Sequence, residues 1–189
     1  MTTPKEGLPR WEQKGSRQLA HTRILDLDLV TYHHPVRNVD REFVVIKTSD
    51  WVNVVAVTPE AKLVLVRQFR FGTNDFSLEI PGGIIEAGED PVFAGVRELR
   101  EETGYSGSAR FLAKAHPNPA IQSNWVHFIL AEDVAREYAL EWDRDEEIEV
   151  EVRPIDEVLA LVRAGQITHS LTVCALMHFE GYWRSRAQT

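Results

Sequence analysis

The segment Gly83–Tyr105, GIIEAGEDPVFAGVRELREETGY, constrains the fold most, because it encodes a helix together with both of its ends. Asp90 is a good N-cap, and Pro91 suits the first helical position, where its missing N–H has no helical partner to lose. Apolar residues recur at helical spacing, at Val92, Val96 and Leu99. Gly104 then favours a C-terminal cap. The sequence therefore predicts a helix over 91–103 with one buried stripe.

The same helix carries three carboxylates on one face. Glu98, Glu101 and Glu102 are related by i+3 and i+4 spacing, so they are neighbours that repel one another unless a cation lies between them. Clustered carboxylate oxygens suit Mg²⁺, with Mn²⁺ as the alternative. The other interpretation is a solvated helix face, and for an isolated run of this kind that interpretation is the more common one.

Residues before and after this face are candidate members of the same site. Glu89 precedes the helix and could join the metal ligands from its loop. Gly82 and Gly83 allow the backbone to come close, so a carbonyl there could bind the ion. Arg97 lies beside the carboxylates and could hold one of them in position.

The rest of the chain predicts a layered α/β domain. Strand-like runs occur at 21–29, 42–46, 52–57, 63–69, 109–115, 126–131 and 148–152, and helices are expected at 154–165 and from about 170 to 183. Residues 1–20 are expected to be a loose polar lead-in, and 132–147 a long acidic loop. We expect residues 1–48 to form the lead-in and a small antiparallel sheet, and 49–189 to form the main domain.

Composition limits the classes of partner. The 21 basic and 29 acidic residues give a net charge of −8, which argues against general binding to nucleic acid or to anionic membranes. The single cysteine, Cys174, excludes an internal disulfide, and its apolar neighbours favour a buried structural role. The polar N-terminus lacks the apolar core of a signal peptide, so a cytoplasmic protein is expected.

The segment Gly83–Tyr105 resembles the Nudix box, G-x5-E-x7-R-E-U-x-E-E-x-G-U, where U is a bulky aliphatic residue. The matching positions are Gly83, Glu89, Arg97, Glu98, Leu99, Glu101, Glu102 and Gly104, and Tyr105 departs only in being aromatic. The resemblance implies a Nudix fold, a mixed β-sheet sandwiched between helices. It also implies Mg²⁺ bound through Glu98, Glu101 and Glu102 with help from Glu89, and a hydrolysed nucleoside diphosphate. In that reading Arg97, Glu101 and Glu102 belong to the catalytic set.

The approach to the box is similar to that of ADP-ribose and nucleoside-diphosphate-sugar pyrophosphatases. The runs VRQFR at 66–70 and LEIPGG at 78–83 carry this likeness. It implies that Arg70, with Arg67, contacts the substrate, that Glu79 supports substrate or metal, and that the Gly82 carbonyl is a metal ligand. Without the likeness, both arginines would read equally well as ordinary charges on a strand surface.

Two loops of this branch have counterparts here. The loop 116–123 resembles a substrate-facing, proline-containing loop, but it has Gln122 where several ADP-ribose enzymes have a glutamate, and a glutamine cannot act as a base. The general base usually lies on the loop before the last strand. That places it in 132–147, with Glu141 and Glu146 as the leading candidates and Asp143, Asp145 and Glu147 as the others. The alternative is an acidic loop that is merely solvated.

Trp51, at the start of a strand, could stack on a nucleobase, although packing in the core or in a dimer interface is the commoner use of such a residue. The histidines lack zinc-type spacing and read as structural or surface residues. Members of the branch are typically homodimers whose N-terminal sheets contribute to the partner's substrate site, so a homodimer is implied.

The expected function is Mg²⁺-dependent hydrolysis of ADP-ribose or a related nucleotide sugar to a nucleoside monophosphate and a sugar phosphate. One alternative is a pyrophosphohydrolase of damaged nucleoside triphosphates. Another is a non-catalytic regulator that binds nucleotide sugars on the same fold, although the sequence contains no basic stretch of helix-turn-helix type.

Overall fold

The chain divides into two compact units in a computed structural model that describes residues 7–142 and 147–186. One unit contains the residues up to Ser49 together with Asn118–Asn124. The other contains Asp50–Pro117 and the residues from Trp125 onward. The segment Asn118–Asn124 joins the first unit through main-chain hydrogen bonds, from Ile46 N to Ile121 O at 2.7 Å and from Ser123 N to Ile46 O at 3.2 Å.

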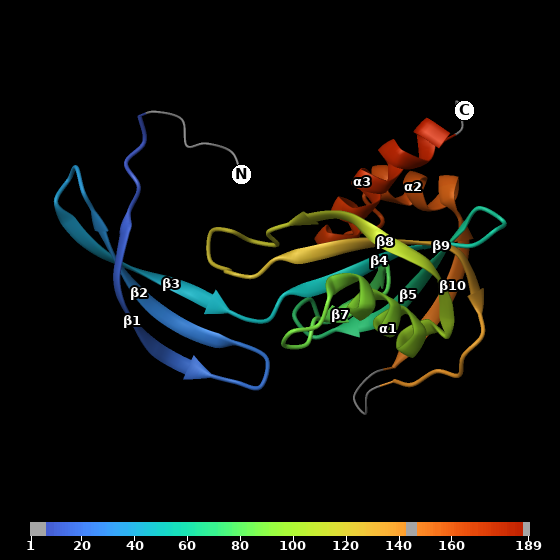
Figure 1. The fold of residues 1–189 in the computed structure, drawn as a ribbon, viewed down its shortest axis with the longest axis horizontal. Coiled ribbons are helices and arrows are strands. Elements are labelled where there is room, and N and C mark those ends of the chain that lie inside the picture. The colour runs from blue at the N-terminus through green and yellow to red at the C-terminus, as the bar shows by residue number, and fades with distance from the viewer. Residues whose placement is uncertain (1–6, 143–146, 187–189) are drawn as a thin grey trace. The chain divides into compact units, whose positions relative to one another are not determined.

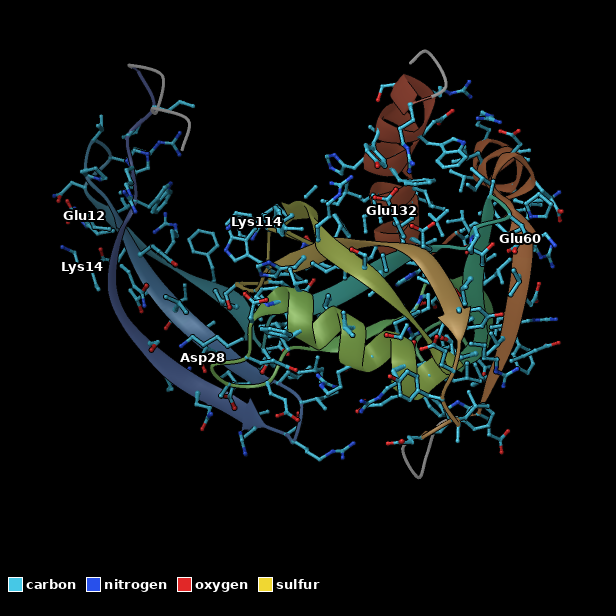
Figure 2. The ribbon with its side chains drawn as sticks, turned by 45° about the vertical axis from the view of Figure 1, so that its right-hand side comes forward. Glu12, Lys14, Asp28, Glu60, Lys114 and Glu132 are labelled. Carbon is cyan, nitrogen blue, oxygen red and sulfur yellow. The ribbon has the colours of Figure 1, made fainter. Side chains whose placement is uncertain are left out.

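The N-terminal unit is a three-stranded antiparallel sheet, in the order β1 (Glu12–His21), β2 (Asp26–His34) and β3 (Val39–Lys47). The expected loose lead-in over residues 1–20 is therefore wrong from Glu12 onward. Every residue of β1 is exposed, so the strand lacks the alternation that sequence reading needs, and its main-chain pairing with β2 specifies it instead. Two ion pairs stabilise this sheet. Lys14 and Glu12, both labelled in Figure 2, are 2.8 Å apart, and Lys47 lies 2.5 Å from Asp28.

The main sheet contains β4, β5, β8, β9 and β10 on its continuous path. Their bounds are Trp51–Val57, Lys62–Arg70, Tyr105–Ala115, Val126–Arg136 and Ile148–Pro154, and they lie in the order β10-β5-β4-β9-β8. Strands β4 and β9 pair parallel, whereas the other neighbours pair antiparallel. The sheet is thus mixed, as predicted.

Strands β4 and β5 separate soon after they pair, and this separation positions the site. They share only the pairs Ala56↔Val64 and Val57↔Leu63. Beyond that point β5 pairs with β6 (Asp75–Glu79), and β4 pairs with β7 (Gly82–Ile84). The linker between β6 and β7 is tied to β4 by a hydrogen bond from Val54 N to Pro81 O at 2.8 Å. The Glu79–Gly83 stretch therefore runs between the two diverging strands.

Helices cover both faces of the sheet (Figure 1). Helix α1 (Pro91–Thr103) packs on one face, in a cluster that includes Val54, Leu99 and Ile129. Helices α2 (Ile155–Arg163) and α3 (Ser170–Arg186) pack on the other face, around Phe128 and Phe179. This arrangement confirms a mixed sheet between helices.

Both ends of α1 lie where the sequence predicts them. Asp90 accepts hydrogen bonds from Val92 N at 2.8 Å and Phe93 N at 3.3 Å, which satisfies main-chain donors of the first turn. Gly104 ends the helix with φ 74°, a left-handed conformation that glycine adopts without strain. The two terminal helices also lie within a few residues of their predicted bounds.

The predicted acidic loop is too long at its start. Strand β9 continues through Glu132 to Arg136, which pairs with Tyr105 in β8. The carboxylate of Glu132 accepts a hydrogen bond from the Tyr182 hydroxyl at 2.9 Å, so an acidic residue that reads as loop is paired within the domain. No helix among the described residues is long and apolar enough to span a membrane.

Candidate active site

The acidic face of α1 lies beside Gly82 and Gly83 at the start of β7. The main-chain N–H of Gly82 donates to Glu102 Oε2 at 3.0 Å, and Glu102 is only 3% exposed. Glu98 and Glu101 are half-buried on the same face. The structure therefore brings the three glutamates of the Nudix-like segment close to the Gly82 backbone, although Gly82 and Glu102 are 20 positions apart along the chain.

Arg97 organises the carboxylates around it. Its Nε and Nη2 donate to the two oxygens of Glu89, each at 3.0 Å. Its Nη1 donates to Glu98 at 2.9 Å and to Glu101 at 3.1 Å, and its Nη2 also reaches Ile84 O at 3.1 Å. Arginine suits this position because its planar fork makes several bonds in fixed directions. The sequence predicted that Arg97 holds one carboxylate, whereas in the structure it bonds to three.

The charges on this face stabilise one another. Hydrogen bonds from Arg97 hold the pKa of Glu89 below its ordinary value, against burial, which would raise it. In return, the hydrogen bonds to Glu89 and the charge of Glu98 raise the pKa of the Arg97 guanidinium, although burial opposes this. Both groups therefore remain ionised at neutral pH, and the face carries more negative than positive charge.

Two glycines allow β7 to approach α1 and β4. A Cβ on Gly83 would lie 2.5 Å from Cδ and 2.6 Å from Oε2 of Glu98. A Cβ on Gly82 would clash with the carbonyl oxygen of Val52 and lie 2.9 Å from Asn53 Cα. Gly83 thus leaves room for a carboxylate, whereas Gly82 leaves room for a neighbouring strand.

The chemistry of these donors fits a hard divalent cation, since carboxylate and carbonyl oxygens are its preferred ligands. Over residues 7–142 and 147–186, however, no three His, Cys, Asp or Glu side chains converge on a point where a metal ion could bind. The reason is visible in their partners: Glu98 and Glu101 turn toward Arg97, and Glu102 turns toward Gly82 N. Joint ligation requires some of these side chains to rotate.

Arg70 on β5 and Glu79 on β6 form a two-point ion pair. Arg70 Nε donates to Glu79 Oε1 at 2.8 Å, and Nη2 donates to Oε2 at 2.7 Å. The Glu79 side chain is 1% exposed, whereas that of Arg70 is 43% exposed. Burial alone would raise the pKa of Glu79, but hydrogen bonds from Arg70 and the charges of His169 and Arg70 hold it below its ordinary value.

Arg67 lines a cavity of 370 Å³ with Phe76, Trp142 and residues 147–149. Its guanidinium lies over the Phe76 ring, 5.2 Å from the centroid. Arg70 pairs with Glu79 whereas Arg67 lies over Phe76, so the two arginines of β5 have different surroundings. The cavity is exposed and has an aromatic and a cationic wall.

One candidate base lies next to α1. Glu141 N donates to Glu101 O at 3.0 Å, and Trp142 Nε1 donates to Glu102 O at 3.0 Å, so this segment caps the last carbonyls of the helix. The Glu141 side chain is exposed. Glu146 falls outside the described residues, as do Asp143 and Asp145, whereas Glu147 lines the cavity beside Arg67.

The remaining candidates from the sequence have other partners. Trp51 packs against the core cluster on the α2–α3 side, which is the packing role weighed for it. Gln122 belongs to the N-terminal unit, where its N–H donates to Asn118 O at 2.8 Å. Cys174 is half-buried beside the same core as Trp51, and burial raises the pKa of its thiol.

Two residues that the sequence did not indicate contact Glu79 or the end of α1. His169 lies 3.0 Å from Glu79, and Trp142 holds the end of α1. Neither has a local signature, because each partner is at least forty positions away along the chain. The spacing of the histidines in the sequence can indicate a zinc site, but it cannot indicate that His169 lies next to Glu79.

Comparisons with known proteins identify the family of the chain. A family model described as the NUDIX domain matches residues 47–171. ADP-ribose pyrophosphatase of Bacillus subtilis is 32% identical over 167 residues, which cover 86% of this chain and 89% of that protein. GDP-mannose pyrophosphatase of Citrobacter koseri is 33% identical over 123 residues, 60% of this chain and 64% of that one.

A solved structure shares the fold. The crystal structure of an ADP compounds hydrolase matches 98% of this chain and 100% of its own with a TM-score of 0.86, at 23% identity. At that identity the likeness shows the fold alone, whereas the domain match and the Bacillus relative show ancestry. The chain belongs to the Nudix family and is one of its pyrophosphatase enzymes.

Proposed function

We propose that this enzyme hydrolyses the diphosphate bond of ADP-ribose, or of a related nucleoside diphosphate sugar, in the presence of Mg²⁺. The observation that carries the proposal is the acidic face of α1, packed against Gly82 and Gly83 of β7. Arg70, on β5, is held by the buried carboxylate of Glu79. The named activities of the Bacillus and Citrobacter relatives support a nucleotide sugar as the substrate.

Nudix hydrolases generally need a divalent metal, which would offset the phosphate charge and lower the pKa of the attacking water. Glu98, Glu101, Glu102 and the Gly82 carbonyl would hold it. Arg97 keeps the glutamates close together despite their mutual repulsion, and Arg70 would bind a phosphate oxygen of the substrate.

A carboxylate on the segment that follows Glu141 would accept the proton of the attacking water, a contribution of about 10²–10⁴-fold. Glu141 is favoured among the described residues because its main chain is anchored to Glu101. The expected products are a nucleoside monophosphate and a sugar phosphate, AMP and ribose 5-phosphate in the case of ADP-ribose.

The test is a substrate panel with Mg²⁺, read by chromatography of the products. We expect AMP from ADP-ribose, with UDP- and GDP-sugars and nucleoside triphosphates as comparisons. Pyrophosphate released from triphosphates in preference to sugar phosphate would favour the triphosphatase alternative. Binding of ADP-ribose without turnover would favour the regulator.

We also propose that the chain forms a homodimer. The support is the N-terminal unit, which exposes large apolar side chains: Ile24 at 55% between β1 and β2, and Phe43 at 46% and Val44 at 43% on β3. Large apolar side chains left exposed in a small sheet unit are typical of an interface. Light scattering coupled to gel filtration is expected to give twice the chain mass of 21.6 kDa, and Phe43→Glu is expected to shift it toward the monomer. A monomeric wild type would contradict the proposal.

A further inference from the structure

The segment 137–142, which follows β9, is bonded to the end of α1 that carries two glutamates of the Nudix box. Glu141 N donates to Glu101 O, and the indole Nε1 of Trp142 donates to Glu102 O, each at 3.0 Å. The last carbonyls of a helix have no partner within the helix, so a local cap or water usually satisfies them. Here the donors come from residues forty positions away, and they bond to two consecutive residues that are proposed metal ligands.

The same segment contacts the cap of α1 at its near end. The N–H groups of Glu137 and Tyr138 donate to Gly104 O at 2.9 Å and 3.1 Å. The Arg100 guanidinium lies over the Tyr138 ring, 5.5 Å from its centroid. A Cβ on Gly104 would clash with the carbonyl oxygen of Tyr138, so the glycine also leaves room for this approach. The segment therefore follows the end of the helix from Glu137 to Trp142.

The helix is the fixed partner in these contacts, and the segment depends on them. Helix α1 is packed into the core through Ala94 and Leu99, neither of which is exposed to solvent. In the segment, Leu140 is half-buried and the other residues are exposed, with 40% exposure for Trp142. A stretch with so little buried apolar area has a low local stability, so its hydrogen bonds determine its position. Loss of one of these bonds should therefore displace the segment and leave the helix in place.

We propose that Trp142 is a positioning residue for the general base: its indole N–H ties the segment to the Glu102 carbonyl and so keeps the exposed carboxylate of Glu141 within reach of the attacking water. The inference rests on the proposed function, in which Glu141 is the favoured base. The indole bonds to the main chain of Glu102 and not to its carboxylate, so the bond occupies no oxygen of the proposed metal-ligand side chains. Its loss should slow the chemical step without weakening metal binding.

The variant Trp142→Phe removes the N–H donor and keeps an aromatic ring. We expect kcat for ADP-ribose to fall about tenfold, because a catalytic group displaced by about 1 Å can cost up to about 10²-fold in rate. KM should stay within about threefold of wild type. The affinity for Mn²⁺, followed by electron paramagnetic resonance, should stay within about twofold. Trp183→Phe, the same change on α3, is the matched control and should change kcat by less than about twofold.

A second pair of variants tests whether Trp142 acts through the base. Glu141→Gln is expected to lower kcat about a hundredfold, at the lower end of what a general base contributes. In that background Trp142→Phe should lower kcat by less than about twofold further, because no base remains to be displaced. Urea unfolding of each variant should give a midpoint close to that of the wild type, since both side chains are exposed.

Four results would overturn the inference: an unchanged kcat in Trp142→Phe, a loss of Mn²⁺ affinity parallel to the loss of kcat, an equal loss of kcat in the Glu141→Gln background, or a Glu141→Gln enzyme with the kcat of wild type. A wild-type protein that turns over ADP-ribose would in each case leave the proposed function intact. A wild type that neither binds nor cleaves nucleotide sugars would instead overturn the proposed function.

Discussion

Replacing Glu102 with glutamine is expected to lower kcat for ADP-ribose by about a thousandfold while the protein stays folded. Glutamine has the same shape, and its amide oxygen can still accept the hydrogen bond that Gly82 N makes at 3.0 Å. It removes the negative charge, which metal ligation needs, and metal assistance contributes several kcal/mol to such reactions, where about 1.4 kcal/mol corresponds to tenfold in rate. Steady-state release of AMP at saturating ADP-ribose measures the effect.

A matched control is Glu132→Gln, the same change at a glutamate of β9. Glu132 bonds to Tyr182 and lies beside α3 (Figure 2), away from the residues that contact Gly82. Its kcat should stay within about threefold of wild type, because a paired charge of this kind affects stability by only about 1 kcal/mol. Binding of Mn²⁺, followed by electron paramagnetic resonance, should weaken in Glu102→Gln alone. Equal AMP release from wild type and Glu102→Gln would remove Glu102 from the mechanism.

The helix at the centre of the site was predictable because its determinants are local. Asp90 and Gly104 act on the main chain within one turn, and the spacing of the three glutamates follows from helical geometry. The opposite holds for β1, whose exposed residues show no alternation and whose position depends on β2. Local patterns therefore specified α1 fully and the N-terminal sheet only in part.

Contacts between distant segments were beyond local patterns. The proximity of Gly82 to Glu102 follows from the separation of β4 and β5, which no residue of the Nudix box encodes by itself. His169 and Glu79 are ninety positions apart, and their contact depends on how α3 packs against the β6–β7 linker. Resemblance to the family supplied the Gly82 neighbourhood, whereas nothing in the sequence indicated His169.

Alanine at the two neighbouring glycines should cause two different failures. At Gly83 the atoms nearest the new Cβ belong to the end of the Glu98 side chain, which can rotate away. Gly83→Ala is therefore expected to keep its stability within about 1 kcal/mol of wild type but to lose about a hundredfold in kcat, as a displaced ligand no longer meets the metal. At Gly82 the Cβ meets the backbone of β4, which cannot move without breaking the sheet.

Gly82→Ala is accordingly expected to cost about 1–3 kcal/mol of unfolding free energy, the range of overpacked cores, and to lose activity only as a consequence. Urea unfolding and steady-state kinetics on both proteins separate the two cases. Gly88→Ala is a poor control because its φ of 83° would itself be strained, whereas Gly181→Ala, with open space around its Cβ, should change neither quantity by much. The reverse pattern would be a Gly83→Ala protein that unfolds at lower urea and a Gly82→Ala protein that stays stable but inactive. That result would contradict the view that Gly83 leaves room for Glu98 and that Gly82 packs against β4.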